Sequence, residues 1–233
     1  RLIGEIGSSI RPGMSRYAIF DTYIRKRLDE DATDGIRALS IVAKHLSDSI
    51  SFSLSIRDLE RIAEQQSIPT AILRHLHDAN LLIQEEDYIN FGHELYLDAF
   101  TAESIIRSSS SNIQSILNEL QSPLNEERKH LIIGAIDNTS LLIQVLSEIS
   151  DEKIIQACLS EHCGKVAYEW AENYCHEIIK KMNKEIEDVR FIFDDTTWTK
   201  VEAIQETLTS WSLQELSFIN ALPHVFIKGK FFD

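Results

Sequence analysis

Glycine and proline are scarce in this chain: eight glycines and four prolines interrupt 233 residues. These two residue types most often end helices and form turns, so long stretches without them favour a protein built almost entirely of helices. Apolar residues make up 43% of the chain and charged residues 26%, which is typical of a folded protein with a hydrophobic core. The length suits one large domain or two to three small ones.

The net charge of −14 constrains the partners of the protein. It works against non-specific binding to nucleic acid or to anionic lipid, because a polyanion repels phosphate. No apolar run approaches the roughly 20 residues of a membrane-spanning helix, and no signal peptide is recognisable. Three cysteines do not make a disulfide framework, which favours a reducing compartment. We therefore expect a cytoplasmic protein without membrane contact.

The first part of the chain alternates helices with a short extended segment. Residues 15–30 predict a helix, because apolar side chains recur three or four positions apart and Ser15 is suited to cap its start. A second helix is predicted at about 36–46. The alternating segment 52–56 predicts a short strand, and Ser55 with an acid three positions later is typical of the start of a further helix.

A helix and two strands follow. Pro69 lies near the start of that helix and Asn80 at its end, where a left-handed cap is tolerated. The stretch LLIQEEDYINF at 81–91 predicts two short strands joined by a tight acidic turn. Helix, strand, helix, helix and hairpin is the layout of a winged helix. We assign this domain to 31–107, with 1–30 as a helical lead-in.

Residues 108–112 read SSSSN, a low-complexity stretch that predicts a linker. Beyond it, 113–233 predicts an α-helical array with short connections. Paired helices of this kind suggest a repeat layer such as HEAT, armadillo or tetratricopeptide units, although no motif recurs at a fixed period. The predicted helices are 113–121, 125–137, 139–148, 151–161, 164–186, 195–209 and 212–221. The expected fold is mainly α: a winged helix with a small β-hairpin, then the array.

The end of the winged-helix region carries a resemblance to a known family. The stretch FGHELYLDAFTA, preceded by the helix SRYAIFDTYIRKRL and the winged-helix pattern, resembles the region just after the ATPase core in STAND-type signalling ATPases. These are the NACHT and NB-ARC relatives of the AAA+ proteins. The resemblance covers about residues 10–107. The residues that carry it are Phe91, His93, Asp98, Phe100 and Ala102.

In that family, the histidine of this stretch hydrogen-bonds the β-phosphate of bound ADP and holds the protein closed. The resemblance implies the same cofactor-binding role for His93. An imidazole at a helix N-terminus lies beside the positive end of the helix dipole, which suits an approaching anion. A histidine here also suits a purely structural role, as a cap or as part of the joint between hairpin and helix.

The phosphate-binding part of such an ATPase is not recognisable in this sequence. Neither a G-x-x-x-x-G-K-[ST] loop nor a G-x-G-x-x-G motif occurs. Because the chain starts at Arg1 and ends on FIKGKFFD, we expect a piece of a longer protein. The resemblance then implies a regulatory segment that is not itself an enzyme and has no cofactor of its own, with ADP or ATP bound in the parent.

The expected partners follow from the same resemblance. The winged helix would dock on the parent's own nucleotide-binding domain, and the helical array would sense a ligand or hold a protein partner in signalling or defence. The resemblance is also compatible with an oligomeric parent. The alternative is a winged-helix DNA-binding transcription regulator with a helical effector or dimerisation domain.

DNA recognition by a winged helix needs cations on the exposed face of its second helix-turn-helix helix and around it. Here that helix offers Arg74, His75 and His77, against Asp78 and the acidic wing 85–87. A phosphate backbone would meet negative charge. We therefore expect this domain to dock on protein, with nucleic acid an unfavourable partner.

Five residues within a short span invite a zinc interpretation. Their spacings lack the paired C-x-x-C or H-x-x-x-H arrangement of a convincing site, although Cys158 and His162 would share a face on one helix. Buried free thiols are commoner, so we assign no metal ligands. The five residues are Cys158, His162, Cys163, Cys175 and His176.

The remaining motifs have simpler interpretations. The basic cluster at 23–28 is typical of a solvated helix face. The stretch HEIIK at 176–180 lacks the second histidine of a zinc protease motif. No nucleophile, base and orienting residue occur with family spacing, so we assign no catalytic residues. Core packing is expected for the aromatic residues of the array, Trp170, Tyr174, Trp198 and Trp211.

Overall fold

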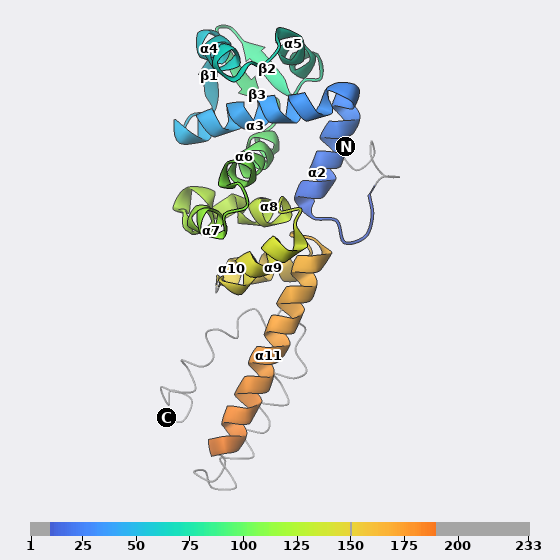
Figure 1. Cartoon of the computed structure of the whole chain (residues 1–233), viewed down its shortest axis with the longest axis vertical. Helices are drawn as coiled ribbons and strands as arrows, with labels where there is room; N and C mark the ends of the chain where they lie inside the picture. The colour runs from blue at the N-terminus through green and yellow to red at the C-terminus, as the bar shows by residue number, and fades with distance from the viewer. Residues whose placement is uncertain (1–9, 150, 190–233) are drawn as a thin grey trace.

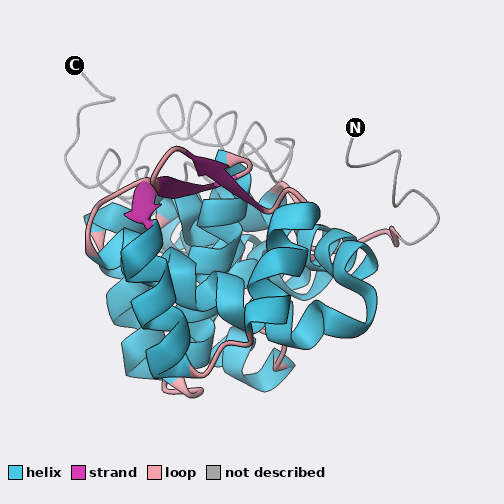
Figure 2. Ribbon diagram, turned by 90° about the horizontal axis from the view of Figure 1, so that it is seen from above, coloured by secondary structure: helices cyan, strands magenta, loops and turns pink. Residues whose placement is uncertain are grey.

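The computed structural model of the protein describes residues 10–149 and 151–189. In these ranges the chain is mainly helical and carries a small three-stranded antiparallel sheet (Figures 1 and 2), in agreement with the predicted fold class at this level. None of the described helices is both long enough and apolar enough to cross a membrane. The helices predicted at 195–209 and 212–221 lie outside the described residues.

The elements follow in two groups along the chain. The first group is α2 (Arg16–Leu28), η1 (Asp29–Asp31), α3 (Ala32–Asp48), β1 (Ser53–Ser55), α4 (Ile56–Gln66), α5 (Thr70–Asp78), β2 (Leu82–Glu85), β3 (Tyr88–Phe91) and α6 (Glu94–Ser109). The second group is α7 (Ile113–Gln121), η2 (Pro123–Arg128), α8 (Lys129–Gly134), α9 (Thr139–Ser147), α10 (Glu152–Leu159) and α11 (Lys165–Val189).

Short polar side chains begin and end the first helices where the sequence predicts. Ser15 Oγ accepts a hydrogen bond from the Ala18 N–H at 3.0 Å, and Ser55 Oγ accepts one from the Asp58 N–H at 3.1 Å. Each bond satisfies an amide that the helix itself leaves without a partner. Asn80 adopts the left-handed conformation, with φ 51°, just after α5. Local chemistry alone therefore sets these boundaries.

Strand β3 is the centre of the sheet, whose order is β1-β3-β2. Strands β2 and β3 form the predicted hairpin, with Glu86 in the left-handed conformation in its turn. Strand β1 pairs antiparallel with the other edge of β3, so that Leu54 lies opposite Ile89, and both side chains are buried. The sequence predicts the extended segment at 52–56, but only the tertiary structure identifies β3 as its partner.

The single helix predicted at 125–137 consists instead of two short elements, η2 and α8. Asn125 is 3% exposed, and its side-chain amide donates to the backbone carbonyl and to the carboxylate of Glu119, at 3.0 and 2.9 Å. These bonds tie the start of η2 back to the end of α7. A side chain that competes in this way for backbone groups favours a tight turn over a continuous helix.

The predicted linker at 108–112 forms the end of α6 and an ordered corner. Ser109 belongs to the helix and is 4% exposed. Ser110 is left-handed, with φ 47°, and Asn112 caps α7 by accepting a hydrogen bond from the Ser115 N–H at 3.0 Å. Serine and asparagine here serve as helix ends, a role that composition alone does not distinguish from a linker.

Two hydrophobic clusters form the core, and both are continuous through α2 and α6. The upper cluster comprises buried residues from Tyr23 to Phe100. The lower cluster comprises Tyr17 and buried residues from Ala102 to Met182. Helix α2 therefore contributes to both clusters, and α6 passes from one to the other within two residues. The long axis of the molecule in Figure 1 follows this succession.

Aromatic rings join α2, α6 and the sheet where the two shared helices meet. The Phe20 ring lies 5.5 Å from that of Tyr96 and 5.3 Å, edge-on, from that of Phe100. The Phe91 ring stacks on Phe100 at 5.9 Å. Such pairs contribute about 0.5–1.5 kcal/mol each beyond the area they bury. The orientation of α6 against α2 depends on this group.

Replacement of Phe100 by alanine should destabilise the protein by about 3–5 kcal/mol, because a fully packed ring leaves a cavity. Phe100 is 2% exposed. Phe52, which is 76% exposed, provides the matched control, and its replacement by alanine should change stability by less than about 0.5 kcal/mol. Urea unfolding followed by circular dichroism measures both values. Similar losses in the two variants would contradict the packing described here.

Candidate functional site at the start of helix α6

His93 is the N-cap residue of α6, between the sheet and that helix. Its backbone is extended, with φ −159° and ψ 143°, and its Nδ1 accepts a hydrogen bond from the Leu95 N–H at 3.1 Å. The side chain is exposed. Gly92 precedes it at a close approach, where an added Cβ would lie 2.3 Å from the carbonyl oxygen of Asn80. Only glycine fits there, so the hairpin fixes the direction in which the chain reaches His93.

This capping bond determines the tautomer of the ring. An imidazole that accepts at Nδ1 carries its proton on Nε2, and in His93 the described residues leave that N–H without a partner. Nε2 is therefore a donor for a group outside the described residues. The first-turn amides and the positive end of the helix dipole favour an anion at the same place. A phosphate oxygen suits this geometry, and the cap survives its binding.

The other residues of the family-like stretch secure α6. Phe91 stacks on Phe100, as described above, and Ala102 is fully buried in the lower cluster. Asp98 Oδ1 lies 3.0 Å from Arg128 Nη2 of η2. Burial raises the pKa of Asp98, and the Arg128 guanidinium opposes that rise. These contacts hold α6 against the sheet on one side and η2 on the other, and so position His93.

A hollow of about 260 Å³ opens beside the first turns of α6, between α2, α6 and α8. Its walls are mostly apolar, and Leu95, which is 51% exposed, forms part of its rim. We call it the α2–α6 hollow. The residues that line it are Arg16, Ile19, Phe20, Leu95, Ala99, His130 and Leu131.

Two cationic or ionisable side chains of this hollow contact a third one outside it. Arg16 Nη2 lies 2.8 Å from Nε2 of His162, and the rings of His130 and His162 lie 6.0 Å apart. Burial, Arg16 and His162 lower the pKa of His130. Burial and Arg16 lower the pKa of His162. Both rings are thus neutral acceptors or donors near neutral pH, next to a permanently charged guanidinium.

The helix α5 that a DNA-binding protein would use for recognition exposes Arg74 and His77. His75 Nδ1 is engaged with Asp31 Oδ2 at 2.7 Å. The acidic wing side chains at 85–87 are exposed. The positive charge on this face is therefore small, and part of it is balanced within the protein.

The cysteines and histidines considered for zinc are dispersed. Helix α10 ends at Leu159, so His162 lies in the following loop and does not share a helical face with Cys158. Cys158, Cys163 and Cys175 are buried free thiols. Among residues 10–149 and 151–189, no group of three or more histidine, cysteine or acidic side chains is placed to hold a metal ion.

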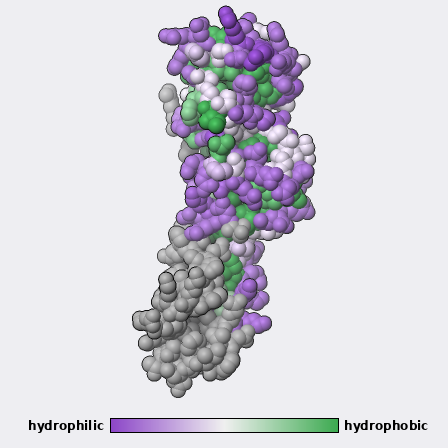
Figure 3. All heavy atoms as spheres, turned by 90° about the vertical axis from the view of Figure 1, so that its left-hand side faces the viewer, coloured by the Kyte–Doolittle hydropathy of each residue, from purple (hydrophilic) through white to green (hydrophobic). Residues whose placement is uncertain are grey.

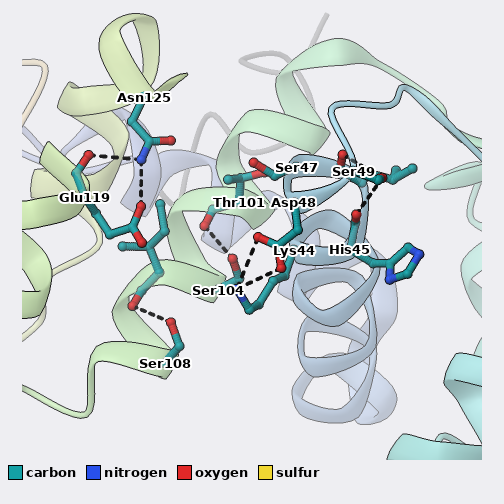
Figure 4. A network of polar contacts seen from close by, with 12 residues as sticks. Lys44, His45, Ser47, Asp48, Ser49, Thr101, Ser104, Ser108, Glu119 and Asn125 are labelled. Atoms are coloured by element: carbon teal, nitrogen blue, oxygen red, sulfur yellow. Dashed lines mark hydrogen bonds and ion pairs between the residues drawn. The ribbon is translucent and has the colours of Figure 1, made fainter. Parts of the chain in front are cut away.

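A second, polar hollow of about 490 Å³ lies on another face of α6, between the end of α3 and η2 (Figure 4). Lys44 Nζ and Asp48 pair within it at 3.1 Å. Thr101 Oγ1 is buried without a hydrogen-bond partner in the described part of the chain. Ile50 and Leu124 on its rim are 76% and 62% exposed, and apolar groups stand out among polar ones on this face in Figure 3. Because its charges are paired internally, we assign this hollow no ligand.

Comparison with known proteins adds no relative: no family model and no curated protein matches the chain. Sequence reasoning identified His93 from its position between a strand and a helix. It overlooked Arg16 and His130 and considered His162 only as a metal ligand. These three residues come from distant parts of the chain and belong to no motif, so only folding brings them together.

The protein should lose stability as the pH falls below 6.5, the ordinary value for histidine. Because His130 and His162 have lowered pKa values in the folded state, the unfolded chain binds protons that the folded chain does not, and the free energy of unfolding falls. Asp98 and Asp137, whose pKa values burial raises, act in the opposite direction, but closer to 3.8.

Replacement of His130 by glutamine should reduce this loss between about pH 7 and about pH 5.5, because one titrating group is removed. Urea unfolding at the two pH values measures it. Replacement of the exposed His77 by glutamine is the control and should leave the loss unchanged. An undiminished loss in the His130 variant would show that burial of this ring is not its cause.

Proposed function

We propose that this chain is the regulatory and transduction segment of a STAND-type signalling or defence ATPase. In this proposal residues 31–107 act as a winged helix that docks on a nucleotide-binding domain. The helical array then senses a ligand or holds a protein partner. The observation that carries the proposal is the geometry of His93: an exposed N-cap whose Nε2–H is available to an anion.

The order of the elements supports a winged helix. Helix α3, strand β1, helices α4 and α5, and the hairpin β2–β3 follow one another in the order this domain requires, and β1 completes the sheet beside β3. The exposed face of α5 and the acidic wing favour a protein partner over DNA. The resemblance of the stretch from Phe91 to Ala102 then suggests which protein surface it meets: a nucleotide pocket.

The proposed role of His93 is to donate its Nε2–H to the β-phosphate of ADP. A hydrogen bond to a charged group contributes about 1.5–3 kcal/mol, which corresponds to a tenfold or greater change in ADP affinity. The same helix α6 carries Ala102 and Ile105 into the lower cluster. A displacement of the α6 start on loss of ADP would therefore be passed to α7 and α8, which pack against α6.

The test is the ADP content of the complete natural protein that carries this sequence, measured by chromatography after purification and denaturation. Two variants separate the cap from the phosphate contact. His93→Ser retains a capping oxygen but lacks the Nε2 donor, whereas His93→Ala lacks both. Both variants should retain about tenfold less ADP than the wild type. Only the alanine variant should also lose about 1 kcal/mol of stability.

His77→Ala is the matched control, because His77 is an exposed histidine on α5, and it should retain ADP as the wild type does. Unchanged ADP occupancy in His93→Ser would rule out the switch role. A loss of ADP in the alanine variant alone would assign His93 to capping and not to phosphate binding.

The second candidate function is a DNA-binding winged-helix regulator, which the layout of α3–β3 and the exposed Arg74 favour. The acidic wing and the net charge of −14 oppose it, because both repel phosphate. We expect no salt-sensitive retention of the chain on duplex DNA at low ionic strength. Retention that decreases steeply with added salt, and that Arg74→Gln abolishes, would favour the regulator instead.

A further inference from the structure

We propose that the α2–α6 hollow binds a small organic anion, a carboxylate or phosphate monoester attached to a compact apolar group. The apolar group would fill the hollow, and the anion would contact Arg16, His130 and His162. This site is separate from the phosphate contact proposed for His93 and does not depend on it.

The hollow has the composition that such a ligand requires. Its walls are side chains of Ile19 and Phe20 from α2, Leu95 and Ala99 from α6, and Leu131 from α8. A volume of about 260 Å³ suits a ring or a short alkyl chain and is small for a nucleotide. Apolar walls with a few convergent polar groups are typical of small-molecule sites.

The positive charge at one end of the hollow is not balanced by its own contact. Arg16 donates to the neutral imidazole of His162, at 2.8 Å, and not to a carboxylate. By contrast, Arg25, Arg107 and Arg128 each form an ion pair with an acidic side chain. In a chain with 37 acidic and 23 basic residues, a guanidinium paired with histidine retains its attraction for an external anion.

The three anion-binding groups are held in place by backbone contacts. The Arg16 N–H donates to the His162 carbonyl at 2.9 Å, and the Lys165 N–H donates to the Gly13 carbonyl at 2.8 Å. Ser15 Oγ donates to the Gly134 carbonyl at 2.9 Å. The start of α2 is thus fixed between the end of α8 and the α10–α11 loop. A site fixed in this way loses little conformational entropy when a ligand binds.

The hollow also lies at the junction of the two clusters. Helices α2 and α6 line it, and each of them contributes to both clusters. A ligand between these helices would contact both halves of the molecule at once. Binding would therefore favour one angle between α2 and α6, which is a means by which a small molecule influences the whole chain.

Three probes separate the two halves of the proposed ligand. Phenyl phosphate carries both the anion and the ring, inorganic phosphate only the anion, and benzyl alcohol only the ring. We expect phenyl phosphate to bind at least about tenfold more tightly than either of the others, because burial of the ring adds to the charge contact. Nuclear magnetic resonance titration should shift the ring signals of His130 and His162 and the methyl signals of Leu95 and Leu131.

Two variants test the two halves of the site. Arg16→Gln should weaken phenyl phosphate binding about tenfold, whereas Arg57→Gln, an exposed arginine of α4, should not. Ala99→Leu fills the hollow and should reduce the affinity for phenyl phosphate to that for inorganic phosphate. Should Ala99→Leu unfold, Leu95→Ser replaces it, because Leu95 is half exposed and its loss removes one wall.

The outcomes are distinct from those for His93. Equal binding of phenyl phosphate and inorganic phosphate, or an unaltered affinity in Arg16→Gln, would overturn the proposal. Shifts confined to the ring of His93 would also overturn it and would place the anion at the start of α6 instead. Failure of every small probe, together with binding of an acidic apolar peptide lost in Arg16→Gln, would reassign the hollow to a protein partner.

Discussion

The packing of α2 against α6 is the contact on which the rest of the structure depends. Phe20 from α2 meets Phe100 and Tyr96 from α6, and each helix continues from there into the other hydrophobic cluster. A chain with so few glycines and prolines has long helices and few hinges. Two clusters are therefore held in one arrangement by two shared helices, and neither cluster can reorient without disturbing that aromatic contact.

Both candidate surfaces derive from this arrangement. His93 caps α6 at the end that carries the sheet, while the α2–α6 hollow lies along the first turns of the same helix. A phosphate at the first and an organic anion at the second would each act on α6, by different contacts. The two proposals are independent in their tests, yet a common helix gives them a common output: the position of α7 and α8, which pack on α6.

Charge explains why the candidate ligands are anions although the chain is acidic. Most of the negative charge is dispersed over exposed helix faces and the wing, where it discourages phosphate polymers. Small positive regions persist where folding separates cations from acids: the helix start at His93, and Arg16 beside two histidines whose pKa values burial and that arginine lower. A single small anion meets only the local field, whereas a polyanion meets the whole surface.

The sequence by itself determined the local features of this protein: its helical character from the scarcity of breaking residues, the caps at Ser15 and Ser55, the turn at Asn80, and a histidine at the joint before α6. Each depends on bonds between neighbours in the chain, which spacing reveals. Only the tertiary structure decided that 108–112 is an ordered corner, that β1 pairs with β3, that the clusters meet inside helices, and that Arg16 faces His162. These depend on contacts between residues far apart in sequence, and no local pattern encodes which distant surfaces come together.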